Sequence, residues 1–391
     1  MNFILFDGSV RNSLLPFTFT RPVADIRIGI LSIREKWEKH LGFTTTTITE
    51  EYLEAKYPMV ELEENVLINA SYLPTKSLVE QVRNLSENQA IFKGEEVIAF
   101  FTSDTQEDVD FDSYEQLEFK EEVLQIKNTW DIFSLNDKAI KADYDLITQG
   151  RTSAPIPEGV HAINKENIFI EEGATISFSS LNASTGPIYI GKDSEIMEGC
   201  LVRGPFALCE YSVLKMGAKV YGATTLGPYC KVGGEVNNSV LFGFSSKGHE
   251  GFLGNSVLGE WCNVGADTNT SNLKNNYAEV KLWDYHAETF TNTGLQFCGL
   301  MMGDHSKCGI NTMFNTGTVI GVSANIFGSG FPRNFIPSFS WGGAAGFTTY
   351  QLNKVIEVAK VVMKRRELEW SEIDEKILQH VFDETAKNRA K

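Results

Sequence analysis

The sequence has no paired cysteine motif and no cluster of basic residues. Its six cysteines lie between positions 200 and 308 without a CxxC pair or a CxxC…HxxxH spacing, so buried reduced thiols are expected. Lys and Arg total 35 against 51 Asp and Glu, a formal net charge of −16. Because nucleic-acid phosphates and anionic lipids attract clustered positive charge, both kinds of partner are disfavoured.

Long hydrophobic runs are also missing. The opening MNFILFDGSVR is too short in apolar residues for a secretory signal, and no stretch reaches 18 uninterrupted apolar residues. The sequence therefore predicts a soluble, cytoplasmic protein that does not bind membranes.

Glycine is scarce in the first part of the chain. Residues 1–150 hold 5 of the 33 glycines and an excess of 27 − 14 = 13 acidic over basic residues, and all other glycines lie between Gly159 and Gly346. This change in composition predicts a domain boundary near residue 150. The expected division is 1–150, 151–346 and 347–391.

The glycine-rich part carries a six-residue repeat. Apolar residues recur at Ile190, Ile196, Val202, Leu208, Leu214, Val220, Leu226 and Val232, then at Leu258 and Val264, and finally at Met302, Cys308, Phe314, Ile320 and Ile326. Three such units close one triangular coil of a left-handed parallel β-helix, with the apolar residue inside. Glycines directly follow the apolar residue where a side chain would crowd the corner, at Gly191, Gly259, Gly265, Gly303, Gly309 and Gly321.

Two interruptions and a helical end complete this pattern. The 26-residue offset from Val232 to Leu258 predicts that Ser239–Ser256 loops away from the coil, and a second break covers about Asn272–Leu300. After Gly346, apolar residues at helical spacing and a capping box at Ser371 predict two helices, expected to cap the open end of the solenoid.

The first 150 residues alternate strand and helix signals. Phe3–Phe6 and Val66–Asn69 read as buried strands, and Ile30–Trp37 and Ser77–Leu85 as helices. This alternation predicts an α/β domain with a mostly parallel sheet, in which ligands bind beyond the carboxyl ends of the strands. The candidate ligand-binding residues there are Asp7, Gly8, Arg11, Arg21 and Asn69, for which turn chemistry is the equal alternative.

Five segments together resemble a known enzyme family. They are GGEVNNSV (233–240), KGHEGFLGNS (247–256), EWCNVGADTNTSNLKNNY (260–277), GDHSKCGINTMFNTGTVIG (303–321) and FIPSFSWGG (335–343). They are similar to the bifunctional UDP-N-acetylglucosamine diphosphorylase/glucosamine-1-phosphate N-acetyltransferase family, in its divergent bacterial form. The resemblance implies a nucleotidyltransferase-like first domain, an acyltransferase β-helix, acetyl-CoA as acyl donor, an amino-sugar phosphate as acceptor, UTP as a further substrate, and a homotrimer.

The resemblance also implies roles for particular residues. His249 corresponds to the base that deprotonates the sugar amine, and imidazole, with a reference pKa of about 6.5, suits that task near neutral pH. The implied substrate-binding residues are Glu235, Asn237, Lys247, Phe252, Asn263 and Asn272, and the implied acyl-donor residues are Ala266, through its backbone N–H, and Gly328.

The chain departs from the family at several of these positions. A lysine that binds the sugar phosphate is replaced by Asn237 and a tyrosine by Phe252, so Lys247, Arg203 and Lys219 are alternatives for the missing cation.

In the first domain, the resemblance places the nucleotide at Asp7, Gly8, Arg11, Arg21 and Asn69. The glycine-rich loop keeps one glycine, and Ala70–Ser71 replace the aspartate expected to bind Mg²⁺, with Asp143 or Asp145 as substitutes. The metal ligands are therefore not assigned.

Two other classes of function compete with this interpretation. A non-catalytic scaffold or regulatory protein would combine a degenerate nucleotidyltransferase domain with hexapeptide repeats, but it would not need the His249 segment. A zinc-dependent carbonic anhydrase on the same solenoid would need three histidines with one closely spaced pair. His249, His286 and His305 are too scattered in sequence for that site.

Overall fold

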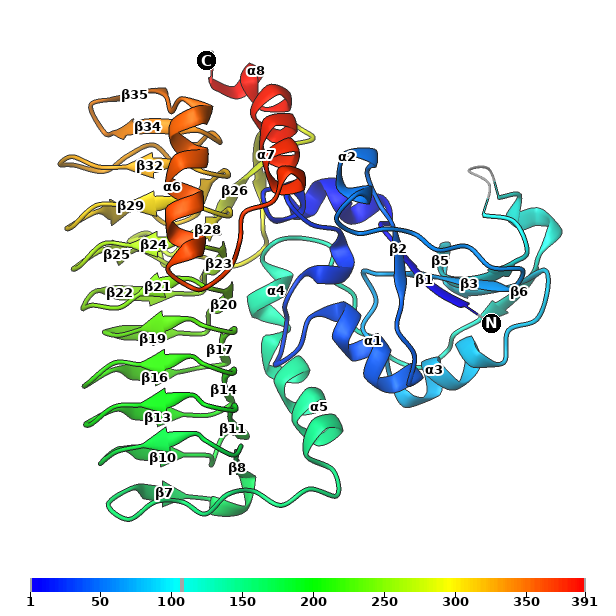
Figure 1. Cartoon of the computed structure of the whole chain (residues 1–391), viewed down its shortest axis with the longest axis horizontal. Helices are drawn as coiled ribbons and strands as arrows, with labels where there is room; N and C mark the ends of the chain where they lie inside the picture. Colours follow the sequence, from blue (N-terminus) through cyan, green and yellow to red (C-terminus); the bar gives the residue numbers. More distant parts are fainter. Residues whose placement is uncertain (1, 106–108, 390–391) are drawn as a thin grey trace.

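The computed structural model describes residues 2–105 and 109–389. An N-terminal α/β part lies beside a column of β-strand coils, and the C-terminal helices run along that column (Figure 1). The predicted fold class, an α/β domain followed by a hexapeptide β-helix and C-terminal helices, is confirmed. Among the described helices, none has the length and hydrophobicity needed to span a bilayer.

The N-terminal part is built on a six-stranded mixed sheet. In spatial order its strands are β2 (Thr46–Ile48), β1 (Asn2–Phe6), β3 (Asn65–Asn69), β5 (Glu96–Thr102), β4 (Gln89–Lys93) and β6 (Glu115–Glu118). The pairings of β5 with β3 and with β4 are antiparallel and the other three are parallel. The helices are α1 (Ile33–Leu41), α2 (Glu51–Glu54), α3 (Lys76–Arg83), α4 (Asp131–Ser134) and α5 (Asn136–Thr148), with 3-10 turns at Ser9–Leu14, Phe17–Phe19, Val23–Asp25 and Phe111–Ser113.

Helix α1 starts three residues later than the sequence pattern predicts. The Ser32 hydroxyl accepts from the Glu35 N–H at 3.2 Å, and the Glu35 carboxylate accepts from the Ser32 N–H at 2.6 Å. This reciprocal cap satisfies two free N–H groups, so the helix begins after Ser32 although apolar residues precede it.

The solenoid has three faces of parallel strands. The first face contains β7 (His161–Ile163), β10 (Ser180–Asn182), β13 (Leu201–Arg203), β16 (Lys219–Tyr221), β19 (Glu235–Asn237) and β22 (Phe252–Gly254), followed by the paired β25 (Asn269–Thr270) and β30 (Met313–Phe314). The second face contains β8 (Ile168–Ile170), β11 (Ile188–Ile190), β14 (Phe206–Leu208), β17 (Thr224–Leu226), β20 (Val240–Gly243), β23 (Val257–Glu260), β28 (Leu300–Met302), β31 (Thr318–Ile320) and β33 (Phe335–Ile336).

The third face contains β9 (Thr175–Ile176), β12 (Glu195–Ile196), β15 (Val213–Leu214), β18 (Lys231–Val232), β21 (Ser246–Lys247), β24 (Asn263–Val264), β29 (Lys307–Cys308), β32 (Asn325–Ile326), β34 (Ser340–Gly343) and β35 (Gly346–Thr349). A 3-10 turn at Lys165–Asn167 precedes β8. All fifteen apolar residues of the predicted repeat point into the column, where each is at most 4% exposed. The six-residue repeat therefore correctly predicted which side chains fill the interior of the solenoid.

The first predicted interruption does not leave the coil. Residues 240–254 form β20, β21 and β22; β20 and β21 pair with the coils before and after them, and β22 pairs with the coil before it. Thr225 pairs with Val240 and Val240 with Val257, steps of 15 and 17 residues, whereas Phe206 pairs with Thr224, a step of 18. The prediction of a loop over Ser239–Ser256 is wrong, because the turns of these coils are shorter and the register shifts without a loop.

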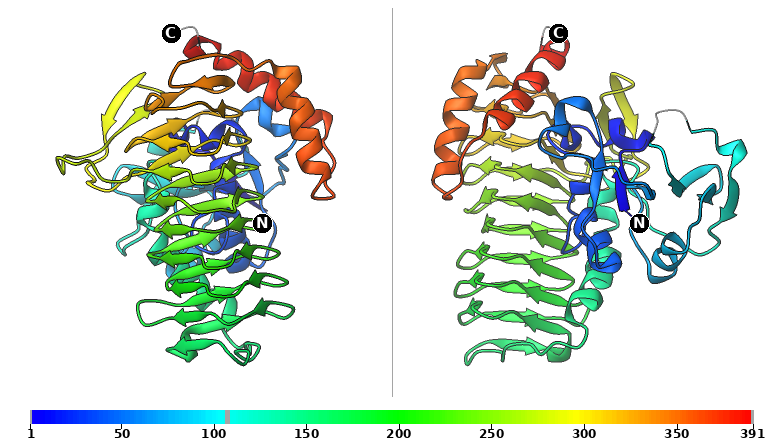
Figure 2. Two further views of the ribbon diagram at one scale, coloured as in Figure 1. Left: turned by 90° about the vertical axis from the view of Figure 1, so that its left-hand side faces the viewer. Right: turned by 45° about the vertical axis from the view of Figure 1, so that its right-hand side comes forward.

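The second interruption does leave the coil. Val257 pairs with Met301, and the intervening chain contains an antiparallel hairpin of β26 (Lys281–Asp284) and β27 (Thr289–Asn292). Figure 2 shows this hairpin, in yellow, projecting from the column. At its base, Val280 and Leu282 are buried in the core of the N-terminal part.

The C-terminal helices are α6 (Leu352–Lys364), α7 (Glu372–Glu384) and α8 (Ala386–Arg389), and the predicted capping box at Ser371 is present. They pack along the side of the column and do not close its end (Figure 1). Just after α6, Arg366 donates to the Tyr229 carbonyl at 3.3 Å, several coils below the end. The prediction that these helices cap the open end is therefore wrong, because their apolar faces pack between the column and the N-terminal part.

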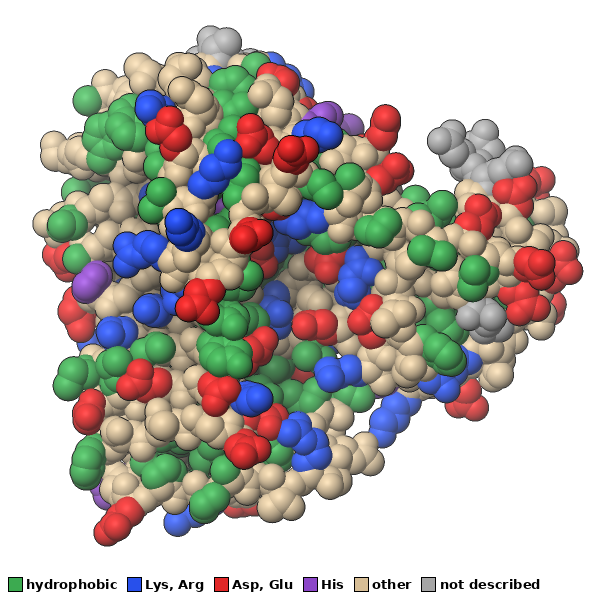
Figure 3. All heavy atoms as spheres, in the orientation of Figure 1, with side chains coloured by type: hydrophobic (Ala, Val, Ile, Leu, Met, Phe, Trp, Pro, Cys, Tyr) green, Lys and Arg blue, Asp and Glu red, His purple; other side chains and the backbone are tan. Residues whose placement is uncertain are grey.

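The second face is covered by the N-terminal part. The rings of Phe17 and Phe242 lie 5.2 Å apart, and the Asn136 amide on α5 donates to the Ala223 carbonyl at 2.9 Å. In Figure 3 acidic side chains gather on the outer end of the N-terminal part, away from the column. The first face is not covered in this way, and it carries three of the candidate site residues, Glu235, Asn237 and Phe252.

Candidate functional site

The edge where the third face turns into the first carries His249. Strand pairing places Ser246 beside Asn263, and the Asp267 N–H donates to the Glu250 carbonyl at 2.9 Å. This register puts exposed His249 next to Ala266 in the following coil. Strands in a sheet are about 4.8 Å apart, so the two backbones are close neighbours.

Gly328 lies further along the same edge. The Asn311 N–H donates to the Ala266 carbonyl, and the Gly309 N–H to the Ile326 carbonyl, both at 2.8 Å. Gly328 is therefore two coils beyond Ala266, and about 14 Å from His249 at the spacing of a sheet. The structure thus brings the predicted base and both predicted acyl-donor residues onto one edge.

The first face holds four more of the predicted residues. Glu235 pairs with Phe252, directly after the His249 turn, and Asn237 pairs with Gly254 at the other end of the same strands. The Asn272 amide donates to the Asn255 side chain at 2.8 Å, close to that end. Asn263 is exposed on the third face, across the edge from this group.

Lys247 points into the column. Its side chain is 2% exposed, and the ammonium donates to the Gly233 carbonyl at 2.9 Å and to the His249 carbonyl at 2.8 Å. Burial lowers the pKa of Lys247 to about 8. The ammonium fixes the turn that carries His249, and the structure gives no support to its predicted contact with substrate.

The other two candidate cations lie in a groove on the first face. This groove has a volume of about 610 Å³ and its lining includes Arg203, Lys219, Tyr221 and Glu235. The Tyr221 hydroxyl donates to Glu235 at 2.5 Å, and the Lys219 ammonium lies 3.7 Å from the Glu250 carboxylate. Of the three alternatives for the missing cation, Arg203 and Lys219 therefore face solvent beside the predicted substrate residues.

Sequence reasoning missed Tyr221 and the groove itself. Each of Arg203, Tyr221 and Asn237 directly follows an inward-pointing valine on a first-face strand. Successive residues of a strand point to opposite faces, so the phase of the repeat carried this information. Examining the residue after each inward-pointing one would have revealed a row of polar side chains on the outer surface of the first face.

The backbone at Ala266 has a free donor. The Ala266 carbonyl accepts from Asn311, but its N–H donates to no residue in the described part of the chain. A fixed N–H at a solenoid turn can stabilise a developing oxyanion without reorganisation. The role of Ala266 at the acyl carbonyl stays a prediction.

Thiols and the buried histidine do not contribute to this site. All six cysteines are buried, as predicted, and burial raises the pKa of those with the deepest thiols, such as Cys230. His305 lies at the turn between the second and third faces, where burial lowers its pKa to about 3. Because that edge is distinct from the one carrying His249, the two histidines do not line one cleft.

Two of the predicted nucleotide-binding side chains, Asp7 and Arg11, bond each other. The Asp7 carboxylate accepts from Arg11 at 3.1 Å, from Thr49 at 2.6 Å and from the Val23 N–H at 2.7 Å, and burial raises the Asp7 pKa. Gly8 packs closely against the Asn69 amide, and a Cβ there would lie 3.0 Å from the amide atoms.

Arg11 and Asn69 are bonded further within the protein. Arg11 also donates to the Thr18 carbonyl at 2.6 Å and to the Tyr52 hydroxyl at 3.0 Å, and the Asn69 oxygen accepts from the Ser71 hydroxyl at 2.8 Å. The structure therefore brings Asp7, Gly8, Arg11 and Asn69 together as predicted. Asp7 and Arg11 bond each other, and Asn69 bonds Ser71 and the Val97 carbonyl.

Arg21 does not belong to this group. Its guanidinium is buried against the solenoid, where it pairs with Asp304 and lies 3.4 Å from Glu260. The predicted placement of Arg21 at the nucleotide is thus not supported by its geometry.

The residues around β3 do not form a magnesium site. Ala70 and Ser71 are buried where a metal-binding aspartate was expected, and the described residues contain no group of three His, Cys, Asp or Glu side chains suited to a metal. Asp143 is buried and pairs with Lys36, while Asp145 is exposed on α5. Mg²⁺ prefers several oxygen ligands, and this donor set does not fit it.

Comparison with known proteins finds a family similarity for the first part of the chain. Residues 3–152 match the family model described as sugar nucleotidyl transferase. No curated protein matches the sequence. Three solved structures are similar. The polySia specific acetyltransferase NeuO is 11% identical over 49% of this chain and 85% of its own, with a TM-score of 0.26. AntD, an N-acyltransferase from Bacillus cereus, is 13% identical over 53% of this chain and 91% of its own, with a TM-score of 0.23, and LpxA, a UDP-N-acetylglucosamine acyltransferase from Bacteroides fragilis, is 12% identical over 57% and 96%, with a TM-score of 0.24. Identities and TM-scores this low assign no substrate to the present chain.

Proposed function

We propose that the protein is an acetyl-CoA-dependent N-acetyltransferase that acts on an amino-sugar phosphate such as glucosamine-1-phosphate. The observation that carries the proposal is the adjacency of exposed His249 to Ala266, whose N–H is free, at one solenoid edge. The sugar nucleotidyl transferase match over residues 3–152 supports a place in sugar-nucleotide chemistry.

The proposed reaction is attack of the sugar amine on the thioester carbonyl. The amine loses a proton to the His249 imidazole, a C–N bond forms, and the C–S bond breaks to release coenzyme A, whose thiolate takes up a proton. The Ala266 N–H stabilises the negative charge that develops on the carbonyl oxygen. Phe252 and Glu235 lie on the first face beside this edge, where they hold the sugar ring.

The acceptor's phosphate is assigned to the groove on the first face. Arg203 and Lys219 line it together with Glu235, so a phosphate bound there keeps the sugar on the face that follows the His249 turn. Guanidinium and ammonium groups form strong, charge-assisted hydrogen bonds to phosphate oxygens. Asn237, which replaces the family lysine, need not supply the positive charge.

We also propose the division 1–150, 151–346 and 347–391, a homotrimer and a cytoplasmic location. Formation of UDP-N-acetylglucosamine from UTP is a second candidate activity, favoured by the family match over residues 3–152. The Asp7 and Arg11 side chains, bonded to one another, favour the alternative that this domain binds a sugar or nucleotide without catalysis, or serves as a scaffold.

The experiment is a coupled assay on the full-length protein. Thiol release from acetyl-CoA with glucosamine-1-phosphate is expected in the wild type and is expected to be lost in His249→Ala. His161→Ala, which changes an exposed histidine on the first coil, is the matched control and should retain full activity. Full activity of His249→Ala would refute the assigned base.

Nucleotidyl transfer is measured by then adding UTP and magnesium and following pyrophosphate. Pyrophosphate release would establish the second activity, and thiol release alone would confine the chemistry to the solenoid. Absence of both signals with a panel of amino-sugar phosphates would favour the scaffold alternative.

A further inference from the structure

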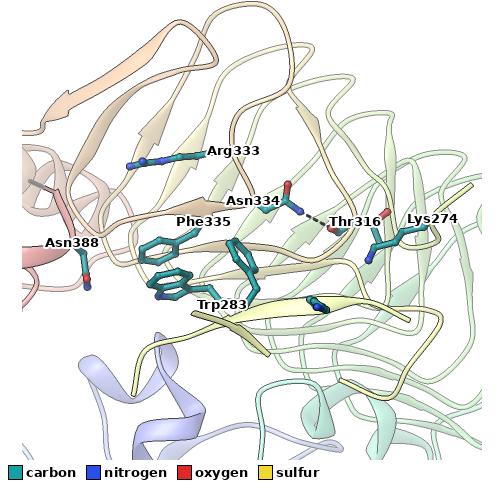
Figure 4. Close-up of a pocket in the computed structure, with 9 residues that line it drawn as sticks. Lys274, Trp283, Thr316, Arg333, Asn334, Phe335 and Asn388 are labelled. Carbon is teal, nitrogen blue, oxygen red and sulfur yellow. Dashed lines mark hydrogen bonds between the residues drawn. The ribbon is translucent and has the colours of Figure 1, made fainter. Parts of the chain in front are cut away.

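A separate cavity of about 640 Å³ lies at the hairpin that leaves the solenoid (Figure 4). Its walls come from three parts of the chain: the segment from Lys274 through the hairpin, the last coils around Thr316 and Phe335, and Asn388 on α8. Cavities of roughly 300–1,000 Å³ are typical of small-molecule sites. None of the residues assigned above to acetyl transfer or to the nucleotide lines this cavity.

An aromatic platform forms one wall. The rings of Trp283 on β26 and Phe335 on β33 stack with centroids 4.2 Å apart and planes 11° apart, and Phe290 meets Trp283 edge-on at 5.4 Å. The Trp283 indole N–H is buried and has no hydrogen-bond partner among the described residues. Phe290 is 40% exposed in this wall, so a ligand with a flat ring can stack on the aromatic surface there.

Three cations surround this platform. Lys274, Lys281 and Arg333 line the cavity, which has no acidic residue in its lining. The Lys274 ammonium donates to the Glu279 backbone carbonyl at 2.8 Å, and Arg333 lies over the Phe347 ring at 5.6 Å. None of the three makes an ion pair within residues 2–105 and 109–389.

The cluster of positive charge is unusual in this chain, whose net charge is −16. Positive side chains that line one cavity attract an anionic ligand into it. Aromatic rings stack on bases, and each such contact contributes about 1–3 kcal/mol of binding free energy. The cavity therefore joins the two features that recognise a base carrying phosphates.

We propose that this cavity binds a nucleotide with a diphosphate, its base against Trp283 and Phe290 and its phosphates on Lys274, Lys281 and Arg333. That chemistry occurs both in a free nucleoside diphosphate and in the nucleotide half of coenzyme A. The site lies where the first face turns into the second, whereas His249 lies where the third turns into the first.

The test is isothermal titration calorimetry on the full-length protein with ADP, UDP, coenzyme A and inorganic pyrophosphate. Wild-type protein is expected to bind ADP or coenzyme A in the micromolar range. The double variant Lys281→Ala/Arg333→Ala should weaken that binding at least tenfold, and both side chains are exposed, so the fold should be retained. The matched control, Lys165→Ala/Lys192→Ala, removes two exposed cations from the first coils and should leave binding unchanged.

A second variant tests the platform. Trp283→Leu should lower the affinity for ADP at least tenfold and leave the affinity for pyrophosphate unchanged, because only the base contacts the indole ring. Tighter binding of coenzyme A than of ADP would show that the cavity binds the nucleotide half of the acyl donor. Tighter binding of ADP would show that it binds a free nucleotide.

Two results would overturn the proposal: no heat with any nucleotide at about 1 mM, or equal affinity in wild type and the double variant. The test does not depend on acetyl transfer, because His249→Ala should bind ADP as the wild type does.

Discussion

The guanidinium of Arg21 donates to the carboxylate of Asp304 across 283 residues of sequence, and this ion pair joins the N-terminal part to the solenoid. Both side chains are about 5% exposed. Asp304 also accepts from the Thr20 hydroxyl at 2.7 Å and from the Glu260 N–H at 2.8 Å. The pair is the centre of one polar contact in an interface that also contains apolar contacts, such as Phe17 with Phe242, and further hydrogen bonds, such as Asn136 to the Ala223 carbonyl.

Replacing Asp304 by Ala should destabilise the protein strongly. The change leaves a buried guanidinium without its nearest carboxylate, a loss that costs about 3 to 5 kcal/mol of unfolding free energy. Urea unfolding measures it. Lys141→Ala removes the exposed Lys141–Asp137 pair and should cost at most about 1 kcal/mol, and equal effects of the two changes would contradict the assignment.

His305 should make the protein sensitive to acid. Its pKa is about 3 in the folded state against 6.5 for the free side chain, because burial disfavours the imidazolium beside Lys307 despite nearby Asp304. The unfolded chain therefore binds the proton first, so stability is lost as pH falls from 6.5 towards 3. Between pH 7 and 5 the loss due to His305 is about 2 kcal/mol.

The variant His305→Phe isolates this contribution. Phenylalanine and tryptophan already occupy equivalent left-handed positions at Phe244 and Trp261, so the backbone accepts an aromatic residue there. Unfolding free energies measured at pH 7 and pH 5 should differ less in the variant than in the wild type. An unchanged difference would show that His305 is not responsible.

Glycines at the coil corners should differ sharply in their tolerance of alanine. A Cβ at Gly191 would lie 2.7 Å from backbone atoms of the next coil, whereas at Gly309 the nearest atom is 3.6 Å away. Gly191→Ala should therefore cost about 1–3 kcal/mol through overpacking. Gly309→Ala should be neutral or slightly stabilising, because alanine reduces the entropy of the unfolded chain. Thermal melting compares the two, and similar melting temperatures would contradict the close packing.

The groove on the first face should recognise the acceptor's phosphate. The double variant Arg203→Ala/Lys219→Ala is expected to raise KM for glucosamine-1-phosphate at least about tenfold, equivalent to about 1.4 kcal/mol. KM for unphosphorylated glucosamine should not change, since that substrate lacks the charged group. Steady-state assays with Lys192→Ala as control check this, and an equal rise for both substrates would place the phosphate elsewhere.

The sequence was informative wherever periodicity determines structure. Positions such as Ile190 and Leu226 identified the column interior because a period of six matches no helix. The shortened turns before Val240 were misread, since deleting residues from a turn shifts the phase without creating a loop. Pattern alone cannot distinguish these cases.

The hydrophobic pattern of the sequence could not predict contacts between segments that are far apart in the chain. Arg21 was predicted to bind the nucleotide, yet its partner is Asp304, and only the docking of the two parts reveals this ion pair. Likewise Lys247 was read as a surface cation, although its ammonium is held inside the coil by two carbonyls. Side-chain direction at a short turn depends on the coil above and below.

Equivalent positions along the solenoid edge that carries His249, Ala266 and Gly328 are separated by a constant spacing, the distance between successive coils. Each coil adds about 4.8 Å, so positions along this edge can separate only in whole multiples of that rise. Substitutions can change the side chains along the edge, whereas its spacing changes only when an entire coil is gained or lost. An extended acyl donor lying along it would be selected by length, and enzymes with additional coils here would accommodate longer donors.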